Sequence, residues 1–468
     1  MSNPPVLAVI VKNSTSPIPD HGISFGEALR VWIRIALLSF GGPAGQIAVM
    51  HRILVDEKKW IGEGRFLHAL NFCMMLPGPE AQQLAIYICW LLHRIKGGLV
   101  AGTLFVLPGM VAIMGLSWLY VLAADASPVA ALLFGVKAAV VAIVFQAVTR
   151  IGKRSLGNRP RLAVAALAFL ALFLFGLPFP LVILAAGIGG WLAGRADIAA
   201  FAGGSGHGPS MSGLDDADSA LGAELPGHAR TSFARLVPLG LILLALWLGP
   251  VALIVALAPA DSAFAPIATF FSKMAMLTFG GAYAVLAWVG QAAVEQYHWL
   301  SPGEMLDGLG MAESTPGPLI IVTQYVGFLA AYRNPGGLDP LLAGTLGGLL
   351  TTWVTFLPCF LWIFMGAPFV ERLRHNRALV SALAAIGAAV VGVILNLACW
   401  FALHYWFAKV DEARIGPLHF TLPDLASIDG AAATLSAAAL IAMLRLRQGV
   451  LTTLAGCALA GLVWRSLF

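Results

Sequence analysis

Long apolar stretches alternate with short polar or charged ones along nearly the whole chain of 468 residues. A helix needs about 20 apolar residues to cross a bilayer. About thirteen stretches are candidates, and the short pairs around Gly176 and Gln448 are the weakest as full spans. Six precede a polar stretch and seven follow it, covering residues 25–50, 66–93, 97–124, 128–149, 162–176, 178–194, 234–258, 264–290, 305–330, 338–366, 378–404, 430–444 and 449–467. This pattern predicts an all-α polytopic membrane protein.

Composition supports this interpretation. Hydrophobic residues make up 59% of the chain and charged residues 11%, whereas soluble proteins carry about 25% charged residues. This balance excludes a disordered protein, a secreted disulfide scaffold and a nucleic-acid binder. The five cysteines lie in apolar stretches without CxxC or Cys/His spacing, so we expect neither a metal site nor a cofactor.

Basic clusters predict the orientation, because loops rich in Lys and Arg stay in the cytoplasm. Counting crossings from a cytoplasmic N-terminus places three clusters inside: Arg150, Lys153, Arg154, Arg159 and Arg161; Arg372, Arg374 and Arg377; and Arg445 and Arg447. The C-terminus is then outside. One loop disagrees, because residues 52–65 carry four basic residues and would face outward. Folding back into the protein is the alternative for that loop.

The chain contains an internal repeat. A shift of 239 residues superposes rare residues of the first half on identical ones in the second: Phe40-Gly41-Gly42 on Phe279-Gly280-Gly281, Trp60 on Trp299, Gly64 on Gly303, and Pro77-Gly78-Pro79 on Pro316-Gly317-Pro318. Farther along, Leu107-Pro108 matches Leu357-Pro358 after an insertion. Several rare residues in one register indicate duplication rather than coincidence.

Seven predicted segments precede the second copy, so the two copies have opposite orientations. Many secondary transporters use inverted repeats to build alternating access around a midplane site. We therefore predict a transporter with five parts: an N-terminal cytoplasmic tail (1–24), a first repeat (25–194), a flexible cytoplasmic linker rich in Gly, Ser and Asp (195–235), an extra connecting transmembrane segment (236–258) and a second repeat (259–468).

The Phe-Gly-Gly and Pro-Gly-Pro motifs interrupt apolar segments at matching places in both halves. Proline removes a backbone donor and glycine loosens a helix, so each motif should break its helix. Opposed half-helix N-termini near the midplane would present N–H groups and positive dipole ends to an anion. The candidate substrate-binding residues are Gly41, Gly42, Pro77, Gly78, Pro79, Gly280, Gly281, Thr315 (as a helix cap), Pro316, Gly317 and Pro318. A packing kink at small residues is the alternative.

Three cations lie inside apolar segments, where each costs about 2.5–3.5 kcal/mol and so marks a partner or a wet cavity. The shift of 239 superposes Arg34 on Lys273, and Lys137 lies in the fourth segment. Cations beside helix breaks predict an anionic substrate, and snorkelling to the interface is the alternative for each of the three.

Uncharged and acidic residues complete the candidate site. Glu80 directly follows the first Pro-Gly-Pro motif and Glu313 shortly precedes the second. Both are candidates for proton coupling, although Glu80 could instead only complement its helix dipole. Four amides could orient an oxyanion or else join neighbouring helices: Gln46, Gln82, Gln83 and Gln324.

These motifs resemble the chromate ion transporter family. The resemblance spans both halves and rests on five strings: Ser39-Phe-Gly-Gly-Pro-Ala-Gly-Gln-Ile-Ala48, Met75-Leu-Pro-Gly-Pro-Glu-Ala-Gln-Gln-Leu84, Leu104-Phe-Val-Leu-Pro-Gly109, Leu277-Thr-Phe-Gly-Gly-Ala282 and Glu313-Ser-Thr-Pro-Gly-Pro318. It implies the long, two-repeat form in the bacterial inner membrane, which exports chromate and confers chromate resistance. Because Leu319 stands opposite Glu80 and Gly387 opposite Lys137, the halves cannot contribute equally.

The expected partners are chromate, or alternatively sulfate, and membrane lipid; a homo-oligomer is left open. A dianion leaving a cell held near ~150 mV negative gains roughly 7 kcal/mol, which favours export driven by the membrane potential or the proton gradient. Spacing does not separate chromate from sulfate, so an oxyanion importer or exchanger is the alternative. A membrane-embedded enzyme is a weaker alternative, because no HExxH or GxSxG motif occurs at membrane depth, and the lack of a nucleotide-binding loop argues against ATP drive. A passive channel is also an alternative, because broken helices line pores too.

Overall fold

The computed structural model describes residues 21–467 except 125, 197, 199–200, 202–213, 223, 225, 227, 229–232, 280 and 368–375. In the first half its elements are α1 (Phe25–Leu38), α2 (Gly42–His51), the π-helix η1 (Arg52–Glu57), α3 (Glu63–Cys73), α4 (Glu80–Ala123), α5 (Ser127–Ser155), α6 (Arg159–Phe173), α7 (Phe179–Arg195) and the short helix η3 (Asp216–Asp218). Gly280 and Asp125 lie outside the described residues, as do Arg372 and Arg374.

The second half has a matching series and one β-hairpin. Its elements are α8 (Phe233–Leu257), α9 (Phe264–Leu277), α10 (Ala282–Gln291), the π-helix η5 (Ala292–Gln296), α11 (Pro302–Ser314), η6 (Leu319–Ile321), α12 (Val322–Arg333), α13 (Pro340–Gly366), α15 (Arg377–Trp406), β1 (Val410–Ile415), β2 (Leu418–Pro423), η8 (Leu425–Ser427), α16 (Gly430–Leu444) and α17 (Val450–Leu467). The antiparallel strands pair Val410 with Pro423 and Ile415 with Leu418, within a stretch that the sequence predicts to be a loop.

The predicted all-α polytopic membrane fold is confirmed. Among the described residues, six helices are long and apolar enough to span a bilayer: α4, α5, α8 from Leu236, α13, α15 and α17. Their outer faces carry exposed Leu side chains, such as Leu122 at 73% and Leu257 at 72%. Exposed apolar surface of this extent is typical of helices that face lipid.

The internal repeat is reproduced in backbone detail. Both copies contain a π-helix at the same place, η1 and η5, and each is followed by a non-glycine residue of positive φ, Lys59 (53°) and His298 (51°). The next residue is a tryptophan whose N–H donates back over 2.8 Å, from Trp60 to Leu54 and from Trp299 to Ala293. The same shift of 239 residues relates each pair, so the duplication predicted from a few rare residues extends to the conformation between them.

Four predicted segments differ from single spans, because each folds as a helical hairpin that starts and ends on one face. In the first copy the hairpins are α1–α2–η1 and α3 with the first part of α4, which ends where φ becomes positive at Arg94. His21, just before α1, contacts the carbonyl of Leu92, and Ala220 of the described linker donates to Lys59. This shared surface, residues 58–65, 90–93 and 214–222, is called the linker face below.

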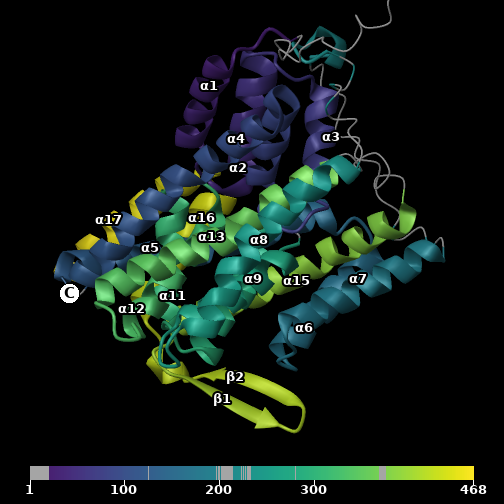
Figure 1. Ribbon diagram of the computed structural model, residues 1–468. Coiled ribbons are helices and arrows are strands. Elements are labelled where there is room, and N and C mark those ends of the chain that lie inside the picture. Colours follow the sequence, from purple (N-terminus) through teal and green to yellow (C-terminus); the bar gives the residue numbers. More distant parts are fainter. Residues whose placement is uncertain are drawn as a thin grey trace, which may run out of the picture.

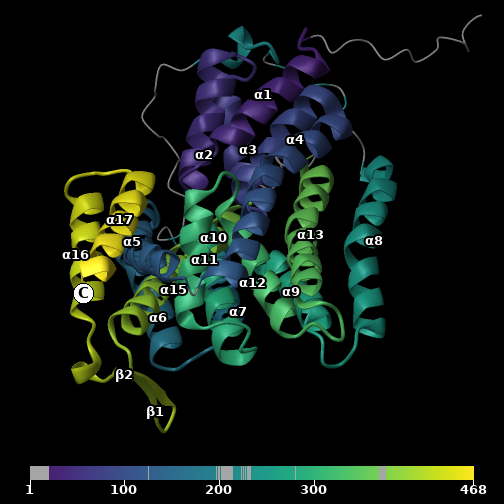
Figure 2. The ribbon, with the colours of Figure 1, turned by 90° about the vertical axis from the view of Figure 1, so that its left-hand side faces the viewer.

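The second copy repeats the arrangement on the opposite side. Its hairpins are α9–α10–η5 and α11–η6–α12. The N–H of Ala263, before α9, donates to the carbonyl of Asn334, after α12, and Arg333 binds the carbonyl of Trp299 over 2.6 Å. The end of η5 lines the same cavity as the β-hairpin, so this surface is called the β-hairpin face. Figures 1 and 2 show α1–α3 at the top, α9, α11 and α12 below them and the β-hairpin at the bottom.

Chain length explains why the hairpins stop halfway. A 14-residue helix such as α1 or α9 rises about 21 Å, which is less than the ~30 Å hydrocarbon core. The inverted copies therefore enter from opposite faces and meet inside the protein, where the glycine and proline breaks lie. Each of the four hairpins replaces one predicted crossing, so the number of crossings falls by an even number and the predicted relative placement of the termini is unchanged. The 52–65 loop, predicted to face outward, instead lies on the linker face.

Candidate functional site

Two reciprocal backbone hydrogen bonds join the breaks of the two copies. The N–H of Gly78 donates to the carbonyl of Thr278, and the N–H of Gly317 donates to the carbonyl of Ser39, each over 2.8 Å. The shift of 239 residues converts one bond into the other. The Pro-Gly-Pro turn of each half is thus fixed to the Phe-Gly-Gly break of the other half, and the structure brings all four predicted breaks together.

Each break is followed by a helix that begins without a side-chain cap. The residues before these starts are Gly41 for α2, Pro79 for α4, Gly281 for α10 and Pro318 for η6. Of the hairpin helices that start at the two faces, α1 and α11 are capped by serine side chains, whereas α3 and α9 also begin without a side-chain cap. Because the first N–H groups of a helix lack intrahelical partners, the breaks supply uncapped donors and positive dipole ends in one region.

Glycine at the breaks lets polar side chains of the other half approach the backbone closely. Gly42 has φ +70°, and a methyl group added there would lie 3.8 Å from the Tyr283 hydroxyl. Gly281 has φ +99°, and a methyl group there would lie 3.6 Å from the Glu80 carboxylate. Each copy therefore places polar side chains against the other copy's Phe-Gly-Gly break.

The two candidate proton-coupling acids differ in their surroundings. Glu313 is 2% exposed; its Oε1 accepts a hydrogen bond from the Tyr283 hydroxyl, and its Oε2 has no hydrogen-bond partner among the described residues. Glu80 is the first residue of α4 and is partly exposed. The buried acid is thus held by one donor, and the other complements the start of its own helix.

Two cations near the end of α5, Arg150 and Arg154, lie within electrostatic reach of the acids at the breaks. Both act electrostatically on Glu80, and Arg150 also acts on Glu313 and Tyr283. Both side chains are exposed, and the Arg154 guanidinium contacts the sulfur of Met74 at the tip of α3 over 3.3 Å. Two guanidinium groups thus add positive charge within electrostatic reach of the acids at the breaks.

The predicted amides lie at the breaks or between helices. Gln46 donates to the carbonyl of Gly317 and Gln83 to that of Pro77, so both hold a Pro-Gly-Pro turn in place. Gln82 reaches only the carbonyl of Gly102, over 3.5 Å. Gln324 donates to Met110 and accepts from Thr352, which joins α12 to its neighbours.

Thr315 and two of the three predicted cations lie differently from the expectation. The hydroxyl of Thr315 donates back to the carbonyl of Ala312, so it does not cap the second restart. Arg34 is half-exposed and pairs with Glu57 over 2.7 Å, and Lys273 is on the exposed face of α9. The structure does not bring Arg34 and Lys273 to the breaks.

The third cation, Lys137, belongs to a separate buried cluster. Its amine lies 3.2 Å from a carboxylate oxygen of Asp307 on α11. The hydroxyl of Tyr120 donates to that same oxygen over 3.1 Å. This cluster joins α5 of the first copy to α11 of the second.

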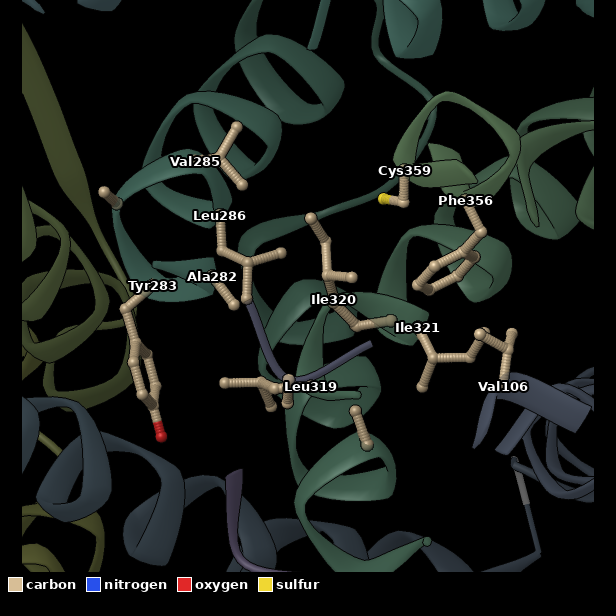
Figure 3. Close-up of a cluster of buried hydrophobic side chains, with 14 of the residues drawn as sticks. Val106, Ala282, Tyr283, Val285, Leu286, Leu319, Ile320, Ile321, Phe356 and Cys359 are labelled. Atoms are coloured by element: carbon tan, nitrogen blue, oxygen red, sulfur yellow. The ribbon is translucent and has the colours of Figure 1, made fainter. Parts of the chain in front are cut away.

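An apolar cluster lies next to the breaks on the side that leads to the β-hairpin face. Figure 3 shows Leu319, Ile320 and Ile321 of η6 between α10, represented by Leu286, and α13, represented by Phe356. The side chains of Ile321 and Leu286 are fully buried. The hydroxyl of Tyr283 points away from this cluster (Figure 3). Packed apolar side chains therefore surround the chain directly after the second Pro-Gly-Pro break.

A cavity of about 670 Å³ opens near the β-hairpin. It lies between the α6–α7 connection, η5, α15 and the hairpin, and Glu295, Asn396, Arg414 and His419 contribute polar groups. The predicted site residues within the described part of the chain are not among those that line it. The cavity is therefore separate from the breaks.

Sequence reasoning missed four functional candidates: Arg150, Arg154, Tyr283 and Asp307. The two arginines were read only as loop charges, although their spacing of four residues places them on one face of a helix. Asp307 is a carboxylate in an apolar segment and carries the same kind of signal as Lys137. Tyr283 has no such signal, because tyrosine is common in membrane helices.

Comparison with known proteins points in one direction. A family model described as "Chromate transporter" matches residues 26–191 and 265–462. A chromate transport protein of Pseudomonas aeruginosa is 31% identical over 81% of this chain and 82% of that relative. One of Cupriavidus metallidurans is 27% identical over 79% and 80%, and an uncharacterised transporter of Methanocaldococcus jannaschii is 23% identical over 80% and 83%. No solved structure matches the chain.

Proposed function

Because the chain belongs to the chromate transporter family, we propose that it exports chromate from the cytoplasm through the bacterial inner membrane and confers chromate resistance. Relatives named chromate transport proteins cover about four fifths of the chain, which supports the substrate. Transport by alternating access is the activity that an inverted pair of repeats performs in many carriers. The predicted division into tail, first repeat, linker, connecting segment and second repeat is retained as part of this proposal.

One observation carries the proposal: uncapped helix starts from both copies meet beside Arg150 and Arg154. Helix N-termini bind oxyanions through their free N–H groups and dipoles. Guanidinium groups bind oxyanions with paired hydrogen bonds. A tetrahedral dianion can accept donors from several directions, so it fits a site where several helices begin.

The substrate site that we propose consists of the breaks with their amides: Gly41, Gly42, Gln46, Pro77, Gly78, Pro79, Gln82, Gln83, Gly280, Gly281, Thr315, Pro316, Gly317, Pro318 and Gln324. Arg150 and Arg154 supply the positive charge next to it. Glu80 and Glu313 remain the candidates for proton exchange at the breaks, since a neutral acid would not repel the anion. The roles predicted for Arg34, Lys137 and Lys273 stay predictions.

Charge distribution supports a cytoplasmic linker face. The 58–65 loop, with Lys58, Lys59 and Arg65, joins the described linker there through hydrogen bonds such as that from Leu221 to Trp60. Basic loops are retained in the cytoplasm. On this orientation the apolar side chains of η6, directly after the second break, lie toward the outside.

Export is the direction that the membrane potential favours. A dianion leaving a cell held near ~150 mV negative gains roughly 7 kcal/mol. Uptake against that potential would require several co-transported cations. Binding from the cytoplasm followed by opening of the apolar cluster would release chromate outside.

Purified protein in proteoliposomes tests this function. We expect saturable chromate flux that responds to an imposed potential, and exchange of labelled chromate against unlabelled chromate. Equal exchange of labelled sulfate would assign a general oxyanion exchanger, and flux that never saturates would assign a channel. Absence of flux and exchange in folded, reconstituted protein would overturn the proposal.

A further inference from the structure

A buried ion pair between the two copies lies apart from the breaks. Asp307 is 2% exposed, whereas the side chain of its partner Lys137 is 24% exposed. The carboxylate oxygen that contacts Lys137 also accepts the hydroxyl of Tyr120. The carboxylate is therefore enclosed while its counter-ion remains accessible.

Two polar atoms of this cluster lack partners. Among the described residues, Oδ1 of Asp307 and the hydroxyl of Tyr325 are buried without a hydrogen-bond partner. The Tyr325 ring contacts that of Tyr120 edge to face, with centroids 5.3 Å apart. A buried acceptor without a donor is costly. A proton on Oδ1 converts that oxygen into a donor and removes the charge of the carboxylate. Protonation would therefore remove the cost of burying an anionic oxygen without a partner.

The pair occurs once although the fold is duplicated. His68 stands opposite Asp307 in the repeat, and Gly387 stands opposite Lys137. Features that the inverted fold itself requires occur twice, as the reciprocal bonds of Gly78 and Gly317 do. A single, asymmetric ion pair indicates a step that the transport cycle needs once.

Both partners lie on helices that lead to the breaks. Thirteen residues separate Lys137 from Arg150 on α5, which is about 20 Å along the helix. Asp307 lies on α11, which ends at Glu313 and Ser314 beside the second Pro-Gly-Pro motif. Breaking the pair would remove the polar link between α5, which carries the arginines, and α11, which carries the buried acid.

We propose that Asp307, and not Glu80 or Glu313 at the breaks, binds the coupling proton of this transporter and that Lys137 is its exchangeable counter-ion. This inference rests on the proposed function. A proton from the β-hairpin face bonds to the carboxylate, the ion pair opens, and Lys137 keeps its charge. The O–H bond breaks again when the proton leaves toward the linker face, and the pair reforms. One proton is taken up and one is released, and nothing is oxidised or reduced.

Other groups near the carboxylate are few. On the described elements packed against α11 they are Glu304 with its partner Arg333, Tyr405 on α15 and Arg465 on α17. Glu304 lies on α11 one turn before Asp307 and is bound to Arg333 over 2.6 and 3.1 Å. Its charge is thus already neutralised, which makes it a matched control.

The test uses the full chain in proteoliposomes with a pH dye inside. Labelled-chromate exchange at equal pH reports binding and reorientation, and net chromate flux with dye response reports coupling. For Asp307→Asn we expect exchange within about twofold of wild type, loss of chromate-dependent proton movement and a flattened pH profile of net flux. Asp307→Glu should restore coupling. Glu304→Gln removes an acid that acts on Asp307 only through its charge, so it should keep both chromate exchange and chromate-dependent proton movement and change only the midpoint of the pH profile.

Contrary results are distinct from failure of the proposed function. Chromate-dependent proton movement at the wild-type ratio in Asp307→Asn would overturn the inference, as would loss of exchange in Asp307→Asn protein that melts like wild type. Lys137→Gln separates the two roles of that residue. Retained exchange with a flattened pH profile supports the counter-ion role, whereas lost exchange places Lys137 in the anion site. Wild-type protein without either activity would instead refute the function itself.

Discussion

The backbone N–H of Gly78 donates to the carbonyl oxygen of Thr278 over 2.8 Å, which ties a turn of the first repeat to a break in the second. Its symmetry mate runs from Gly317 to Ser39. Both carbonyls belong to residues whose hydroxyl groups donate one turn back, to Ile35 and Met274. The breaks are therefore held by paired backbone bonds, and the helix starts beside them remain free for a ligand.

The first prediction concerns the arginines beside these helix starts. Arg150→Gln and Arg154→Gln should each raise the chromate concentration for half-maximal transport by about tenfold, the equivalent of about 1.4 kcal/mol. The reason is loss of positive charge next to the site. Initial rates in proteoliposomes over a range of chromate concentrations measure this effect. The chromate concentration for half-maximal transport should rise more steeply with salt in the wild type than in either variant.

Lys153 supplies the matched control for this charge effect. It lies on the same helix end as Arg154 and carries the same charge, but it is not among the cations acting on Glu80 or Glu313. Lys153→Gln should transport like wild type. An equal loss in Lys153→Gln would show that the whole end of α5 acts through net charge and not through a specific site.

The exposed cations give a second prediction. Arg34→Gln and Lys273→Gln should change chromate transport less than Arg150→Gln, because Arg34 is already paired with Glu57 and Lys273 faces outward. The same initial-rate measurement decides this. Larger losses in these two variants would restore the assignment made from the sequence, in which both cations bind the anion.

The repeat, the helix breaks and the membrane class were predictable from the sequence. Glycine, proline and tryptophan can be recognised at matching positions without knowledge of tertiary contacts. The Pro77–Pro79 turn and its copy at 316–318 were found in this way. The direction of the chain after each break was not predictable. A stretch such as 25–50 is predominantly apolar despite Glu27, Arg30 and Arg34. Its hydropathy therefore predicts one span, whereas α1 and α2 turn back on each other.

The polar groups at the site were harder to predict than the breaks. Glu313 was identified from its place beside a motif, but its donor Tyr283 comes from another hairpin and is 30 residues away. Asp307 and Lys137 are 170 residues apart in different copies. Such pairs form only when the two inverted repeats pack into each other, and contacts between the repeats cannot be predicted from a single sequence.

The hydroxyl of Tyr283 leads to a third prediction. Tyr283→Phe removes the donor to the buried Glu313 carboxylate, and a hydrogen bond to a charged group contributes about 1.5–3 kcal/mol. We expect a lower melting temperature and weaker chromate affinity, measured by thermal unfolding with and without chromate. Tyr297→Phe is the control, because Tyr297 contributes its ring by stacking on Trp299; similar losses in both variants would contradict a specific role.

Backbone conformation at the second Phe-Gly-Gly break gives a fourth prediction. Gly281 has φ +99°, and a side chain there costs on the order of 1–3 kcal/mol. Gly281→Ala should therefore lower both stability and transport rate. Gly26→Ala, at a helical position with open space around it, should be neutral or slightly stabilising. Equal behaviour of the two variants in thermal unfolding and transport would show that the break tolerates other conformations.

Close packing between α5 and α17 gives the last prediction. A methyl group at Gly135 would lie 1.9 Å from the carbonyl oxygen of Cys457, so Gly135→Ala must push the two helices apart. Overpacking of this kind costs about 1–3 kcal/mol, and we expect a lower melting temperature. At Gly152, on the same helix, the nearest atom would be 3.6 Å away, so Gly152→Ala should melt like wild type. Equal melting temperatures would show that α17 moves freely against α5.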